Sequence, residues 1–427
     1  MTKILINNGL VVCPKSDIEH CTNVYIADGK IVAVADELAD FSADHTIDAT
    51  DMIVSPGLID LCADLREPGF TYKATIASET SAAAQGGITQ VCCTPMTNPV
   101  IDNSSVVEQI LQRAKTAGQA KVLPIAALTQ GLEGKYLSSM ASLKQAGCVA
   151  VSNGRNDIVH TNVLRNAFAY AATQDLLVIL QPEDVYLSQN GFAHEGKVST
   201  RLGIPGIPSC AETIAVARAI ELVKQTGVHC HFSKLSTSGA VDLIHQAKQA
   251  GLPVTADVSI NHLHLSDIDI SDFSPLCYVQ PPLRSSQDQT ALLRGLQSGI
   301  IDAICSDHQP HELDAKLAPF SEAEPGISGL DTLLALVWRL QDTQQLSLSQ
   351  AIASLTAKPA AILGIEAGCL SPNTTADICI IDPHNHWVVA SETLASKGKN
   401  TPFMGWEMPA RVAYTLVDGE IIWQSNV

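Results

Sequence analysis

Three side chains that could hold a metal ion follow two strand-like segments of this chain. Cys62 and Asp64 alternate along one such segment, so both side chains lie on the same face of the strand. Asp307 follows a second apolar segment and would lie close to them if the strands close into a barrel. Thiolate sulfur and carboxylate oxygen are both zinc ligands, so a mononuclear site is one interpretation, although zinc sites normally include imidazole as well.

Two His-x-His patterns imitate a metal-binding motif. His229 and His231 lie in one strand-like segment, and His262 and His264 repeat the spacing further on. Ring nitrogens in a polar interior usually form hydrogen bonds with neighbouring groups, and we favour that interpretation over an unorthodox metal site. Lys234 follows the first pattern and would repel a cation, because an ammonium group has three donors and no lone pair.

The composition indicates a globular protein and excludes some partners. Hydrophobic residues make up 46% of the 427 residues, and the formal net charge of -18 repels nucleic acid and anionic membranes. The N-terminus lacks the apolar stretch of a signal peptide, and no apolar run is long enough to span a bilayer. The 12 cysteines are scattered without a CxxC pair, which is typical of buried thiols in a reducing compartment. We expect a cytoplasmic protein.

The middle of the chain alternates strand-like and helix-like segments. This alternation favours a parallel sheet with crossover helices, and eight such units close a (β/α)8 TIM barrel. Polar residues gather at the C-terminal ends of the strands, where barrels build their active sites. The expected strands are residues 57–65, 87–96, 121–128, 148–154, 176–184, 228–236, 253–261 and 301–308, and the clearest helices are residues 77–85, 106–116, 162–174, 211–225 and 240–250.

Both chain ends consist of short alternating strands. Asp28-Gly29 near the start and Asp418-Gly419 near the end are hairpin signals. We expect the two ends to form one small β-sandwich domain, from residues 1–54 and 366–427, around a barrel of residues 55–365.

Several motifs in order resemble the dihydroorotases, which are cyclic-amide hydrolases of the amidohydrolase superfamily. The resemblance covers essentially the whole chain and predicts an α/β fold with a barrel of the amidohydrolase type. The motifs that carry it are residues 55–60 (SPGLID), 65–69 (LREPG), 83–89 (AAQGGIT), 191–206 with HEGK and LGIPG, 281–284 (PPLR), 306–311 (SDHQPH), 325–332 (PGISGLDT) and 399–403 (KNTPF).

The resemblance implies a zinc pair at the barrel mouth that this chain lacks the ligands to hold. In active relatives the metal-bound hydroxide attacks and an aspartate moves the proton. No metal is predicted here, and zinc belongs only to the alternative of a rearranged site. Cys62 and Asp64 stand where the family has the two histidines of the HxH motif, and Asn153 or Gly154 stands where it has the fourth-strand carboxylate. Gln181 and Lys234 stand where it has two further histidines. Only Asp307, which matches the proton shuttle, is retained.

The positions that match the family's substrate-binding residues are partly retained and partly changed. Arg66 matches the arginine that grips the substrate carboxylate, and His311 matches a histidine near the substrate ring, so the resemblance implies retained or vestigial binding residues. Met96 stands where relatives carry an asparagine, and a thioether cannot replace the hydrogen bonds of an amide. For Lys234 we hypothesise that its charge substitutes for zinc by pairing with Asp307 and with Asp64.

These observations leave three candidate functions for the chain. The resemblance favours a non-catalytic structural partner of the aspartate transcarbamoylase catalytic chain, in a homo- or hetero-oligomer of pyrimidine biosynthesis. The second is an active dihydroorotase or cyclic-amide hydrolase, converting dihydroorotate to N-carbamoyl-aspartate at a rearranged or mononuclear metal site. The third is a binding module that senses a carboxylated metabolite of the pathway through Arg66 and His311.

Overall fold

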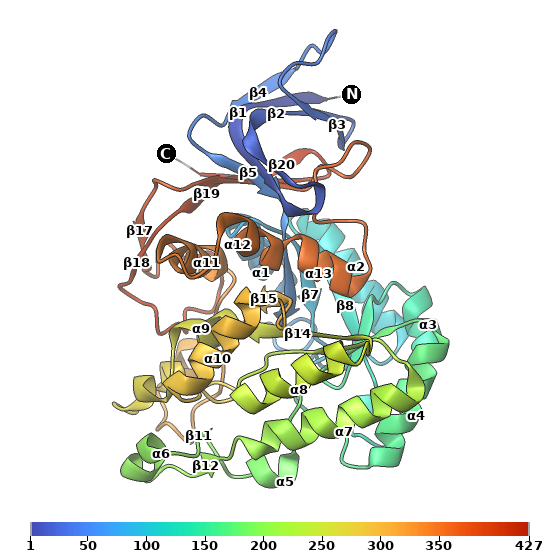
Figure 1. The fold of residues 1–427 in the computed structure, drawn as a ribbon, viewed down its shortest axis with the longest axis vertical. Coiled ribbons are helices and arrows are strands. Elements are labelled where there is room, and N and C mark those ends of the chain that lie inside the picture. The colour runs from blue at the N-terminus through green and yellow to red at the C-terminus, as the bar shows by residue number, and fades with distance from the viewer. Residues whose placement is uncertain (1, 426–427) are drawn as a thin grey trace.

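The computed structural model describes residues 2–425 and contains a barrel of eight parallel strands (Figure 1). A parallel bridge between Ala63 and His308 joins the last strand segment to the first. All eight strands fall within the segments expected from the sequence, which confirms the fold. In barrel order they are β6 (Leu58–Ala63), β7 (Ile88–Cys93), β8 (Lys121–Ala127), β9 (Ala150–Ser152), β10 (Leu177–Leu180), β13 (Cys230–Phe232), β14 (Val254–Ser259) and β15 (Ala303–Cys305).

Helices cover the outside of the barrel, and many begin at a capping side chain. Thr75, Asn103, Thr237 and Ser285 each accept a hydrogen bond from a backbone N–H of the first turn, which satisfies a donor that the helix leaves unpaired. The longer helices are α1 (Ile76–Gln85), α2 (Ser104–Ala117), α3 (Met140–Gln145), α4 (Thr161–Thr173), α7 (Cys210–Thr226), α8 (Ser238–Gln249), α10 (Ser286–Gln297), α11 (Leu333–Asp342), α12 (Leu348–Leu355) and α13 (Ala357–Leu363).

Short elements fill the loops that follow the strands. Four of them, α5, α6, β11 and β12, lie at the end of the molecule opposite the strands of the chain ends in Figure 1. This end is the C-terminal face of the barrel, where the candidate site residues gather. The short elements are α5 (Val185–Ser188), β11 (Ala193–His194), α6 (Lys197–Leu202), β12 (Gly206–Ile207), α9 (Ile260–His264) and the 3-10 turns η3 (Asp267–Ile270), η4 (Pro275–Cys277) and η5 (Leu313–Lys316).

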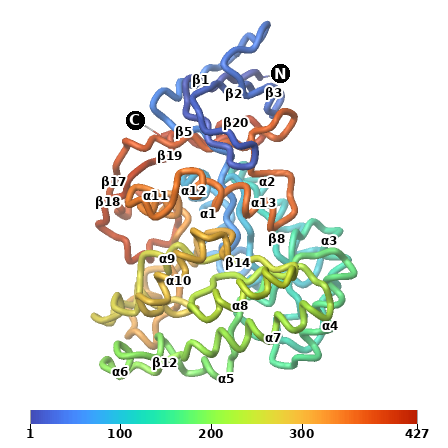
Figure 2. The backbone as a smooth tube through the Cα atoms, viewed as in Figure 1, coloured from blue at the N-terminus to red at the C-terminus, as the bar shows by residue number. Residues whose placement is uncertain are grey.

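The two chain ends share one mixed eight-stranded sheet, and Figure 2 shows their blue and red segments side by side. Antiparallel pairing of β5 with β16 joins them. The expected hairpins form at Asp28-Gly29 and Asp418-Gly419, where all four residues have positive φ, as a type I′ turn requires. The strands are β1 (Lys3–Cys13), β2 (Ile18–Ala27), β3 (Lys30–Ala35), β4 (His45–Asp48), β5 (Ile53–Pro56), β16 (Ile378–Asp382), β19 (Arg411–Val417) and β20 (Glu420–Gln424), with β17 (Trp387–Val388) and β18 (Glu407–Met408) as a separate ladder.

Three hydrophobic clusters hold these parts together. The largest lies between the barrel strands and the helices, a second fills the sheet of the chain ends, and a third lies inside the barrel around Ile59, Leu61 and Ile179. The inner cluster closes the barrel below the polar mouth, as in other barrels of eight strands. All 12 cysteines are unpaired thiols, and nine of them are buried. No helix among residues 2–425 is long and apolar enough to cross a membrane.

Candidate functional site at the barrel mouth

A cavity at the C-terminal face brings together side chains from six strand ends. Gly154, rather than Asn153, faces this cavity. The Asn153 side chain turns away, accepting a hydrogen bond from Thr129 and donating to the carbonyl of Leu132. The residues at the mouth that carry the argument are Cys62, Asp64, Met96, Gly154, Arg155, Gln181, Lys234, Asp307 and Gln309.

Lys234 and Asp307 form an ion pair in the centre of this mouth. Lys234 Nζ lies 2.9 Å from Asp307 Oδ1, and both side chains are almost wholly buried. Gln309 Nε2 donates to the same carboxylate oxygen at 2.7 Å. Burial lowers the pKa of Lys234, but the charge and the hydrogen bond of Asp307, together with Cys62, raise it by more in sum, so the net pKa is raised and the ammonium stays charged.

Asp64 is bound by arginines instead of Lys234. Arg155 NH2 lies 2.7 Å and Arg66 NH1 lies 3.3 Å from its carboxylate, and Thr94 Oγ1 donates to it as well. Burial raises the pKa of Asp64, but Arg155 and Arg66 lower it more strongly, to about 2. The hypothesis that Lys234 also pairs with Asp64 is therefore wrong, because Arg155 and Arg66 form the ion pairs with this carboxylate.

Arg155 is the residue of the site that sequence reasoning missed. It directly follows the pair Asn153 and Gly154, where relatives place a metal-bridging carboxylate, and its guanidinium contacts both Asp64 and Gln309. The sequence feature that could have revealed Arg155 is a basic residue next to an expected ligand position. A planar guanidinium can donate to two acceptors at once, which explains why one residue spans this distance across the mouth.

The mouth does not fit a zinc pair. Three cations, Arg66, Arg155 and Lys234, surround only two carboxylates, and those carboxylates already accept from the cations. Among residues 2–425, no group of three or more His, Cys, Asp and Glu side chains is arranged to hold a metal. Burial raises the pKa of the Cys62 thiol well above its usual range. The mononuclear alternative of Cys62, Asp64 and Asp307 is thus not assembled either.

Arg66 and His311 contact each other and are largely occupied within the protein. Arg66 Nε donates to the carbonyl of Pro310 at 3.1 Å, and Arg66 NH2 lies 3.1 Å from His311 Nε2. Lys73 Nζ lies 3.1 Å from His311 Nδ1, and the carbonyl oxygen of Pro325 lies 3.0 Å from His311 Nε2. Burial and the charges of Arg66 and Lys73 lower the pKa of His311 to about 2, which keeps the imidazole neutral.

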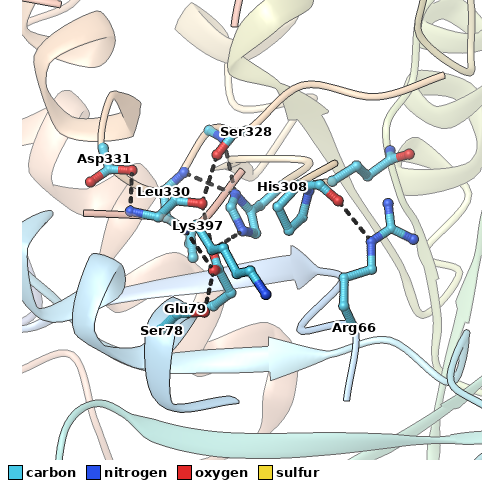
Figure 3. Close-up of polar contacts among 12 residues, drawn as sticks. Arg66, Ser78, Glu79, His308, Ser328, Leu330, Asp331 and Lys397 are labelled. Carbon is cyan, nitrogen blue, oxygen red and sulfur yellow. Dashed lines mark hydrogen bonds and ion pairs between the residues drawn. The ribbon is translucent and has the colours of Figure 1, made fainter. Parts of the chain in front are cut away.

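His308, next to Asp307, is held by a buried carboxylate that the sequence did not reveal. Its Nδ1 accepts from the backbone N–H groups of Gly329 and Leu330, and its Nε2 donates to Glu79 Oε2 at 2.8 Å (Figure 3). Glu79 also accepts from Ser78, Ser396 and the backbone of Lys397. This cluster joins α1, the end of β15 and the C-terminal segment, and it fixes the turn that carries Asp307.

The His-x-His patterns have structural roles. His231 lies 2.8 Å from Thr255 Oγ1 and 2.8 Å from Asp257 Oδ2, and Asp257 also accepts from the backbone N–H of Lys234. His229 is exposed. His262 and His264 contact the backbone carbonyls of Pro282 and Leu336. Gln181 lines the mouth and donates to the carbonyl of Gln280.

Comparisons with known proteins agree with this architecture. A family model described as dihydro-orotase-like matches residues 51–240. A dihydroorotase-like protein of Pseudomonas aeruginosa is 46% identical over 418 residues, which cover 98% of this chain and 99% of the relative. A dihydroorotase of Syntrophus aciditrophicus is 41% identical over 425 residues, covering 99% and 100%. The solved structure of the L-hydantoinase (dihydropyrimidinase) of Arthrobacter aurescens has a TM-score of 0.88 at 23% identity, covering 99% and 96%.

The parallel barrel, with a sheet built from both chain ends, is a (β/α)8 fold like that of the L-hydantoinase structure. Its relatives over almost the full length then define the family. The chain belongs to the dihydroorotase-like family, which confirms the resemblance found in its motifs.

Proposed function

We propose that this chain is a non-catalytic member of the dihydroorotase-like family, retained as a structural partner of the aspartate transcarbamoylase catalytic chain. The observation that supports the loss of catalysis is the ion pair of Lys234 with Asp307. Asp307 matches the family's proton shuttle, and here a fixed ammonium and the Gln309 amide share the same carboxylate oxygen. A carboxylate held in this way is a structural anion and a poor acceptor for a substrate proton.

Opening a cyclic amide needs a nucleophile, and burial raises the pKa of the Cys62 thiol at the mouth, which disfavours its thiolate. Water needs activation by a metal or a base, and the metal positions hold Gln181, Lys234 and Gly154. Asp64 is held by Arg155 and Arg66, which lower its pKa to about 2 and make it a weak base. The active-hydrolase alternative would require these pairs to open and recruit a cation into a site with an excess of positive charge.

The partnership with the transcarbamoylase rests on the family resemblance. A barrel without catalysis is maintained only if its fold serves another purpose, and assembly with the preceding enzyme of the pathway is the purpose that the family suggests. The buried pairs at the mouth support a structural role, because each carboxylate there is paired with a cation without a bound metal.

Two measurements test the proposal. Purified protein that has been dialysed against a zinc-containing buffer is expected to hold no stoichiometric metal. It is also expected to turn over neither dihydroorotate nor N-carbamoyl-aspartate. An active dihydroorotase serves as the positive control. Co-expression with the transcarbamoylase catalytic chain of the same organism, followed by size-exclusion chromatography, is expected to give a joint complex. Zinc-dependent turnover would refute the first half, and separate elution of the two chains would refute the second.

A further inference from the structure

The exposed apolar residues of this protein gather on one face. Of fourteen large hydrophobic side chains that are exposed among residues 2–425, ten lie in the loops after the barrel strands, on the face that carries the mouth. Exposed apolar side chains gathered on one face mark interaction sites, whereas scattered ones need no explanation. The ten are Tyr72, Tyr136, Val159, Val185, Tyr186, Leu187, Ile268, Phe273, Leu313 and Leu317.

Four of them, including the two most exposed, Leu313 and Leu317, come from two segments that pack together, residues 266–280 and 312–326. Lys316 Nζ donates to the carbonyl of Pro275, and the backbone N–H of Gly326 donates to Tyr278. The rings of Tyr278 and Phe320 lie 5.1 Å apart beneath them. These contacts pack η3, η4 and η5 together into one surface unit. Its outer side carries the mouth patch, which we define as Ile268, Phe273, Leu313 and Leu317, exposed by 60%, 48%, 74% and 79%.

Acidic side chains are exposed on the same two segments as the mouth patch. Asp269 and Asp272 are exposed in the first segment, and Asp314 and Glu322 are exposed in the second. A second copy of this chain would bring the same acids against each other, and the chain as a whole carries a charge of -18. Nucleic acid and anionic membranes are repelled for the same reason. The surface that complements this patch is an apolar protein face with a basic rim.

We propose that the mouth patch is the docking surface for a protein partner with a basic and apolar face. This inference rests on the proposed function, in which that partner is the transcarbamoylase catalytic chain. An active enzyme must leave this face open to substrate, but the ion pairs across the mouth remove that requirement here. The face is therefore free to be covered by a partner.

The test compares two double variants in the complex with the catalytic chain. Leu313→Asp/Leu317→Asp places charge in the mouth patch, and Val388→Asp/Ile421→Asp is the matched control, because these residues are 50% and 42% exposed on β17 and β20, outside the loops that follow the barrel strands. We expect the first variant to weaken binding at least about tenfold and the control to leave it within about twofold. Asp314→Lys/Glu322→Lys should also weaken binding, and added salt should weaken the wild-type complex. Circular dichroism checks that each variant is folded.

Hydrogen exchange in the wild-type complex gives an answer that needs no variant. Residues 266–280 and 312–326 should gain protection when the catalytic chain is bound. If the wild type binds but these segments gain no protection and the mouth variant binds equally well, the partnership stands and this surface is wrong. If the wild type does not bind the catalytic chain, the proposed function fails and the docking inference fails with it. Self-association that the mouth variant abolishes would also overturn the inference, because it would make a second copy the occupant.

Discussion

Lys234 Nζ lies 2.9 Å from Asp307 Oδ1, so an ammonium group pairs with the carboxylate that the family resemblance matches to the proton shuttle. Both residues have positive φ, 58° for Lys234 and 48° for Asp307, and so does Arg66 at 61°. Such backbone is uncommon for residues other than glycine and is typical of sites where the surrounding structure fixes the side-chain direction. The strand ends therefore hold the charges of the mouth in place.

Lys234→Ala should reduce the free energy of unfolding by about 3 to 5 kcal/mol, because it leaves Asp307 buried without its cation. Denaturant titration measures the change. Lys135→Ala is the matched control, since its pair with Glu133 is exposed, and it should change stability by less than about 1 kcal/mol. Lys234→Met/Asp307→Leu should recover much of the loss, because neither charge is then left alone. Full stability of Lys234→Ala would contradict this account.

Asp64 should make the protein less stable in acid. Its pKa in the folded state is lowered to about 2, below the ordinary value of about 3.9 in unfolded chains. Its contribution of about 2 to 3 kcal/mol is therefore complete above pH 5 and is lost as the pH falls toward 2. Arg155→Gln should weaken the protein more at pH 6 than at pH 2.5, whereas Arg165→Gln, on the exposed side of α4, should have little effect at either. An equal loss at both pH values would rule out this linkage.

Glu79→Gln should destabilise the fold by about 1 to 3 kcal/mol, because the new amide N–H group faces the donors that the carboxylate now accepts from. His308 Nε2 and the Ser396 hydroxyl are among these donors. Thermal and denaturant unfolding measure the loss. Glu108→Gln, exposed on α2, serves as the control and should be neutral. A neutral Glu79→Gln would mean that the cluster adds nothing to stability.

Dihydroorotate and N-carbamoyl-aspartate should not raise the melting temperature. Arg66 is engaged by Asp64, Pro310 and His311, and a ligand carboxylate would have to displace these contacts. A ligand present at 100 times its Kd would stabilise the protein by about 2.7 kcal/mol, which a thermal-shift titration detects. A saturable shift that Arg66→Lys abolishes would instead support the metabolite-sensing alternative.

Much of the architecture was determined by local sequence pattern. The eight strand segments, the main helices and the hairpins at Asp28-Gly29 and Asp418-Gly419 follow from apolar periodicity and turn chemistry, which act within a few residues. The residue types at the mouth were also readable, because Gln181 and Lys234 cannot supply imidazole wherever the backbone places them.

Only the tertiary structure decided which charges meet. Arg155 reaches Asp64 across 91 positions of sequence, and His308 reaches Glu79 across 229. Whether Asn153 or Gly154 faces the mouth depended on the local backbone and its neighbours. Barrel closure brings strand ends together that no local pattern relates, and the φ and ψ angles at those ends set the direction of each side chain. The sequence by itself therefore determined which residue types stand at the mouth, and the closed barrel decided which of their charges meet.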